Sequence, residues 1–190
     1  MAKDNRNFIY AYDDEGQQII IINAETGKRV EQKDNHVISI LSYLKAQEND
    51  VTLRNFALWC AYEANTTIKP LQKKFLNLAQ KTIDGKSTPE ELKTLYTQSE
   101  GEAIATDTVG LRQGSAKAPG FLASRECINP DAYEGAKNAA RFHCLWAEMN
   151  SKTDTLPDFM EEIGPAASKE TIEQTEQKQI DYLLELIAKV

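Results

Sequence analysis

The sequence contains no apolar run long enough to cross a membrane. Its longest run of aliphatic residues is Ile19–Ile22, whereas a transmembrane helix needs roughly 20 apolar residues. The first seven residues are mostly polar and provide no apolar core for a signal peptide. We therefore expect a protein that has no membrane partner and that is located in the cytoplasm.

Cysteine and histidine are also scarce. The three cysteines, Cys60, Cys127 and Cys144, are an odd number and form no Cys-x-x-Cys pair, which argues against a disulfide framework and against a zinc knuckle. The two histidines are not spaced as metal ligands on a helix. The sequence therefore predicts neither a metal site nor a cofactor, and it fits a reducing compartment.

Basic residues are outnumbered by acidic ones. The chain has 22 lysines and arginines against 29 aspartates and glutamates, with a formal net charge of −7 and a pI of about 5.0. Because binding to nucleic-acid phosphates needs a positive field, direct nucleic-acid binding is disfavoured. The balance favours a basic protein partner, and the acidic cluster Asp13, Asp14 and Glu15 is a candidate contact surface for it.

The sequence is rich in helical periodicity. Phe8–Tyr12 and Gln18–Ile22 are β-branched and aromatic runs around a polar turn that ends at Gly16, which predicts a β-hairpin. From residue 36 onward, apolar residues recur at helical spacing in segments 37–48, 53–64, 70–84, 88–106, 129–147 and 168–190. We predict a mainly α fold in one domain of residues 1–190: a helical bundle-like body of about six helices over 34–190, extended by the hairpin over 1–33.

A glycine-rich stretch interrupts the predicted helices. Gly110–Gly120 contains three glycines and a proline, too many for a stable helix interior, which predicts a long loop. The loop matches neither Gly-x₄-Gly-Lys-Ser/Thr nor Gly-x-Gly-x-x-Gly, so it is not a known phosphate cradle. Two interpretations stay open: an exposed connection, or a contact loop in which Arg112, Lys117 and Arg125 bind an acidic partner or ligand.

His143 and Cys144 are the pair that most suggests catalysis, because a nucleophilic cysteine needs a nearby base. Adjacent positions on a helix diverge by about 100°, so these two side chains do not face each other. A catalytic pair would instead need His36 beside Cys144, or His143 beside Cys60 or Cys127. We predict that these side chains fill the core, and the alternative of a cysteine-dependent hydrolase or transferase stays open.

Four segments together carry a resemblance to a known family: Leu53–Ala64, the helix end at Asp84–Gly85, the helix start at Ser87–Leu92, and the alanine-rich Ala136–Ala140. Over residues 50–150 the pattern resembles the all-helical immunity protein family of bacterial toxin systems. The resemblance implies a helical protein without catalytic residues that binds and neutralises a toxin.

We therefore predict a protein that is not an enzyme and that inhibits a toxin or similar effector by direct protein–protein contact. A second hypothesis is a phage or mobile-element protein that blocks a host defence complex with the same scaffold. A third is self-association, because the apolar stripe of Ile172–Val190 is suited to pairing between subunits as well as to internal packing.

Overall fold

Residues 8–12, 18–23, 36–111, 115, 117–151 and 165–189 are described by a computed structural model. Its helices are α1 (His36–Ala46), α2 (Asp50–Glu63), α3 (Pro70–Ile83), α4 (Pro89–Gln98), α5 (Glu100–Ala105), the π-helical η2 (Thr106–Leu111), α6 (Ala118–Glu126), α7 (Ala132–Ser151) and α8 (Pro165–Ala188). The predicted mainly α class is confirmed for this part of the chain. None of the described helices is both long enough and apolar enough to pass through a bilayer.

Two short strands precede the helices. They are β1 (Phe8–Tyr12) and β2 (Gln18–Asn23), drawn as an antiparallel pair. The side chains of both strands, the connecting turn and residues 24–35 lie outside the described part of the chain. The β-hairpin therefore stays a prediction.

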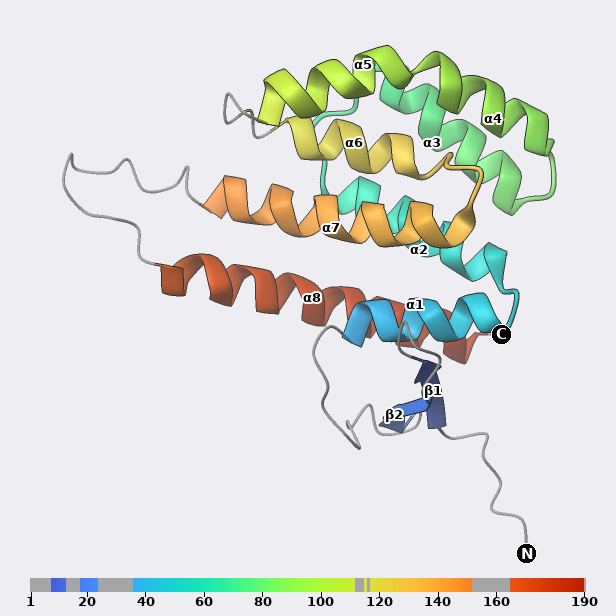
Figure 1. Cartoon of the computed structure of the whole chain (residues 1–190), viewed down its shortest axis with the longest axis vertical. Coiled ribbons are helices and arrows are strands. Elements are labelled where there is room, and N and C mark those ends of the chain that lie inside the picture. The colour runs from blue at the N-terminus through green and yellow to red at the C-terminus, as the bar shows by residue number, and fades with distance from the viewer. Residues whose placement is uncertain are drawn as a thin grey trace, which may run out of the picture.

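The helices are stacked in layers (Figure 1). α1 and α8 lie side by side on one face, α2 and α7 form the next layer, α3 and α6 the third, and α4 with α5 lies outermost. The layer of α2 and α7 contacts the layer of α1 and α8 on one side and the layer of α3 and α6 on the other. This arrangement makes α2 and α7 the centre of the core.

Small side chains allow these two central helices to approach closely. Cys60 and Ala61 of α2, and Ala136 and Ala139 of α7, are all 0% exposed. Phe56 of α2 is also fully buried. The alanine-rich Ala136–Ala140 of α7 therefore contributes to the packing surface.

The predicted long loop over Gly110–Gly120 is wrong at both ends. Residues 106–111 form η2, and α6 begins at Ala118. Pro119 is tolerated because it lies in the first turn of α6, where a backbone N–H has no helical partner in any case. Gly120 is tolerated because α6 meets the end of α2 there, and a Cβ atom would clash with the carbonyl oxygen of Ala64.

The predicted segment 88–106 is also divided. α4 begins with a capping box in which Thr88 N–H donates to Glu91 Oε2 (2.8 Å) and Glu91 N–H donates to Thr88 Oγ1 (3.2 Å). The helix then breaks at Ser99 and continues as α5 and η2. This division and the unexpected α6 raise the number of α-helices in the described residues from the predicted six to eight.

Candidate functional site

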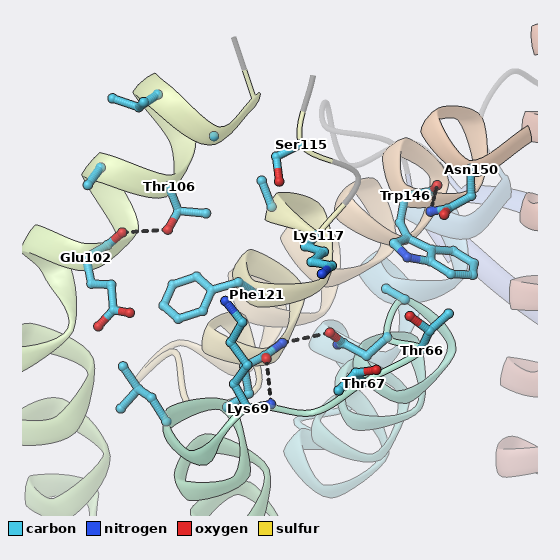
Figure 2. Close-up of a pocket in the computed structure, with 18 residues that line it drawn as sticks. Thr66, Thr67, Lys69, Glu102, Thr106, Ser115, Lys117, Phe121, Trp146 and Asn150 are labelled. Carbon is cyan, nitrogen blue, oxygen red and sulfur yellow. Dashed lines mark hydrogen bonds between the residues drawn. The ribbon is translucent and has the colours of Figure 1, made fainter. Parts of the chain in front are cut away.

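A cleft of about 600 Å³ opens between segments that are distant in the sequence. Its walls are the turn between α2 and α3 with the start of α3, the continuous α5–η2 segment, the start of α6 and the last turns of α7 (Figure 2). Ligand sites in proteins typically enclose roughly 300–1,000 Å³. The size and the convergence of four segments make this cleft the candidate site.

The amide side chains of Asn65, which is half-buried, and Gln72, which is buried, form a hydrogen-bonded base to the cleft. Asn65 Nδ2 donates to the carbonyl oxygens of Ala61 (2.6 Å) and Gly120 (2.9 Å). Gln72 Nε2 donates to Asn65 Oδ1 (2.7 Å), and Ser124 Oγ donates to the Gly120 carbonyl (2.8 Å). Because these bonds join α2, α3 and α6, they hold the walls in place without a ligand.

Two aromatic rings contribute to the apolar part of the lining. Phe121 of α6 is 8% exposed and packs edge-on against Phe75, with ring centroids 5.8 Å apart. Trp146 of α7 is half-buried and lies on the far side of the cleft from η2, away from Phe121 (Figure 2). The indole of Trp146 offers a surface for an apolar or aromatic group.

Three charged side chains line the same space. Lys69, on the turn before α3, and Lys117, just before α6, approach from opposite sides (Figure 2). Glu102 of α5 lies on a third side. All three are exposed, and none has an ion pair with another described residue.

The residues that the sequence marked for partner binding have different locations. Lys117 lines the cleft, and its predicted role in binding a partner stays a prediction. Arg112 and the acidic cluster Asp13, Asp14 and Glu15 lie outside the described residues, so their predicted roles stay predictions.

Arg125 does not flank an exposed loop. It lies in α6 and is 9% exposed. Its Nε donates to Ser99 Oγ (2.9 Å), its Nη2 donates to the Tyr96 carbonyl (3.1 Å), and its guanidinium lies 3.6 Å from the centroid of the Tyr96 ring. The donors of Arg125 are thus used to attach α4 to α6.

Glu126 completes this buried network. Its Oε1 accepts from the Tyr96 hydroxyl (3.1 Å) and its Oε2 accepts from Asn138 Nδ2 (3.1 Å). Burial, together with the nearby charge of Glu126, raises the pKa of Tyr96 to about 12, so the phenol stays protonated and remains a donor. The network therefore has a structural role that the sequence pattern did not reveal.

Cys60, Cys127 and His143 are core residues, and Cys144 is half-buried. Cys60 and Cys127 are buried, and burial raises the pKa of both thiols; burial also raises the pKa of Cys144 to about 12. Burial lowers the pKa of His143 to about 4. Within the described residues no hydrogen bond joins a cysteine to a histidine; Gln179 Nε2 lies 3.3 Å from His143 Nδ1 and 3.5 Å from Cys144 Sγ. These surroundings disfavour the thiolate that a nucleophilic cysteine needs.

Lys69, Glu102, Phe121 and Trp146 were not identified from the sequence. Each belongs to a different helix or turn, so no local spacing connects them. The one local signal is a lysine followed closely by a proline, at Lys69 and again at Lys117, which marks the start of α3 and of α6. That signal predicts a helix start, and it says nothing about a shared cleft.

Among the residues that the structure describes, no group of three or more histidine, cysteine, aspartate or glutamate side chains is arranged to hold a metal ion.

Comparison with known proteins adds no further constraint on the site. The likeness to immunity proteins stays a prediction, because no family model, curated protein or solved structure matches this chain.

Proposed function

We propose that the chain is a non-catalytic binding protein that receives a segment of a protein partner in the cleft between the α2–α3 turn, η2, α6 and α7. The observation that carries this proposal is the cleft itself. It has a hydrogen-bonded base, aromatic walls and a volume of about 600 Å³, which suit a few side chains of a partner.

Exposed apolar surface in the lining supports a protein partner over an isolated small molecule. Val109 lines the cleft from η2 and is 50% exposed. Ile68 is 40% exposed and lies in the α2–α3 turn between the lining residues Thr67 and Lys69. Exposed apolar surface at a hollow is typical of protein interfaces.

The wider role in this proposal is inhibition. When a segment of a toxin or similar effector binds in the cleft, the two proteins form a complex in which part of the effector surface is covered. The same contact would serve a phage or mobile-element protein that blocks a host defence complex. Toxin neutralisation and the blocking of a host defence complex differ only in the identity of the partner. Photocrosslinking to the bound partner reveals that identity.

Site-specific photocrosslinking in the producing cells tests the proposal. A benzophenone amino acid replaces Val109 at the cleft or, as the control, Asp181 on the exposed side of α8. We expect a discrete adduct with one protein from position 109 and none from position 181. Mass spectrometry of that adduct identifies the partner.

Two outcomes would count against the proposal. The first is an adduct that forms from position 181 and not from position 109, because the partner would then bind the α1 and α8 face. The second is the absence of any adduct from position 109 in cells in which the variant is folded and abundant.

A further inference from the structure

The lysines of the cleft stand where two helices begin. Lys69 is the N-cap residue of α3 and Lys117 is the N-cap residue of α6. Lys69 N–H donates to Gln72 Oε1 (2.9 Å), but an ammonium group has no lone pair with which to accept from the first turn. Neither helix start therefore has the side-chain acceptor that serine, threonine or aspartate would supply.

The result is a positive site on an acidic protein. A helix start carries a partial positive charge that an acidic N-cap would offset. Here a lysine stands at that position in both helices, so two ammonium groups and two helix starts add their fields in one cleft. This is the opposite sign from the net charge of the chain, −7.

The remaining wall limits where an anion can lie. Glu102 lines the cleft from α5, and its carboxylate has no ion pair among the described residues. An acidic group is therefore favoured between Lys69 and Lys117 and is repelled near Glu102. A ligand with negative charge along its whole length fits this arrangement less well than one with a single acidic group.

The uncharged lining is suited to the rest of a peptide. Thr66, Thr67 and Ser115 are exposed hydroxyl side chains that can bond with a peptide backbone. Trp146 offers an apolar surface near Thr66 and Thr67 (Figure 2). A single acidic residue next to an aromatic or aliphatic one would use both the charged and the apolar parts of the cleft.

We infer that the cleft binds an acidic peptide segment of its partner, with the carboxylate of an aspartate or glutamate between Lys69 and Lys117 and an adjacent apolar side chain against Trp146. This inference rests on the proposed function, since it names the chemistry of the segment that the cleft receives. Nucleic acid is the competing occupant, and its phosphate in every nucleotide would bring charge close to Glu102.

Selection from a displayed library of short random peptides against the full-length protein tests the inference. The enriched peptides should share an aspartate or glutamate beside an apolar residue. Their dissociation constants should rise about tenfold in the Lys69→Gln, Lys117→Gln double variant, because two charge-assisted contacts are lost. Binding should also weaken as salt is added.

The matched control is a Lys81→Gln, Lys93→Gln double variant. Both of these lysines are exposed and neither lines the cleft, so the net charge changes equally. Binding should change by less than about twofold, because screened surface charges at a distance contribute little. A third variant, Thr67→Trp, identifies the peptides that bind in the cleft. Thr67 is exposed and lines the cleft, so an indole at this position obstructs a bound peptide and leaves the core unchanged.

The outcomes separate the two proposals. Peptides that Thr67→Trp weakens, but that lack an acidic residue or bind the double lysine variant as well as the original protein, would overturn the carboxylate inference and leave the cleft as a binding site. Stronger competition by a single-stranded oligonucleotide than by the acidic peptides would also overturn it. If no enriched peptide is weakened by Thr67→Trp, both the inference and the proposed function fail.

Discussion

Gly120 is the residue at which α6 comes closest to the end of α2. A Cβ atom at this position would lie 2.5 Å from Asn65 Oδ1 and still closer to the carbonyl oxygen of Ala64. The Gly120 carbonyl also accepts from Asn65 Nδ2 (2.9 Å) at the base of the cleft. Glycine is thus required here by close packing of two backbones at the base of the cleft.

Substitution of this glycine gives a direct test of the packing. Gly120→Ala should lower the free energy of unfolding by about 1–3 kcal/mol, because α6 must move away from α2. Gly101→Ala is the control: a Cβ atom at Gly101 in α5 meets nothing within 4 Å, so alanine should raise stability by about 0.5–1 kcal/mol. Urea unfolding followed by circular dichroism measures both, and equal stabilities would show that α6 and α2 are farther apart.

Residue-level function was only partly predictable from the sequence. Lys117 and Arg125 looked alike as basic residues near a glycine-rich stretch, yet one lines the cleft and the other is 9% exposed within a network. Charge alone does not reveal burial, because a buried arginine is satisfied by partners such as Ser99 and Tyr96 that are remote in the sequence. The cysteines were predicted as core residues, and the burial of Cys60 and Cys127 confirms this for those two.

At the scale of elements, α8 is attached to the body through polar as well as apolar contacts. Trp59 of α2 stacks on Tyr182 of α8, with ring centroids 4.6 Å apart. Gln179 of α8 is 1% exposed, and its Nε2 donates to the Ala140 carbonyl (3.0 Å) and lies 3.3 Å from His143 Nδ1. Donation to Nδ1 requires a neutral imidazole, so the docking of α8 is linked to the protonation of His143.

Stability should therefore fall as the solution becomes acidic. Burial, with a smaller effect of Lys178, lowers the pKa of His143 from 6.5 to about 4 in the folded protein. The unfolded chain takes up the proton first, so this stabilisation is complete above about pH 6.5 and is lost as the pH falls toward 4. Between pH 7 and pH 5, His143 should account for a loss of about 2 kcal/mol in the free energy of unfolding.

The control for this prediction is His143→Asn, whose side-chain oxygen replaces Nδ1 as an acceptor for Gln179 but does not titrate. Carboxylates titrate in both proteins, so the difference between their losses from pH 7 to pH 5 isolates the imidazole. Chemical denaturation at the two pH values measures it. Equal losses in both proteins would show that the docking of α8 does not depend on His143.

Most helices were predictable because the local sequence signals, apolar spacing and helix-start residues, agree with the side that each helix buries. α2, α3, α4, α7 and α8 combine apolar spacing with helix-start residues such as Thr88. α6 was missed because proline and glycine both disfavour a helix. Pro119 is tolerated because it lies in the first turn of α6, and Gly120 is needed because it packs against Ala64. The cleft could not be predicted at all, since it exists only where the ends of four elements meet.

For the whole molecule, the layered arrangement predicts cooperative unfolding. α2 and α7 contact the layer of α1 and α8 and also the layer of α3 and α6, so loss of either outer layer exposes the shared core. Trp59 lies against α8 and Trp146 lies at the cleft. We expect one transition, with the same midpoint by circular dichroism, which reports all helices, and by tryptophan fluorescence, which reports these two sites.

Separate midpoints would show that the layers unfold independently and would contradict the single domain predicted for residues 1–190. The measurement needs the full chain at several protein concentrations. A midpoint that rises with concentration would instead indicate the self-association suggested by the apolar stripe of α8.

The polarity of α7 and α8 sets the two ends of the molecule apart. α7 runs toward the cleft, which it lines with Trp146 and Asn150, whereas α8 runs back and finishes at Ala188 at the other extremity (Figure 1). A fusion domain, affinity tag or solid support joined after α8 would therefore leave the mouth of the cleft turned outward. Sensors that immobilise the protein in this orientation should keep their capture surface unobstructed.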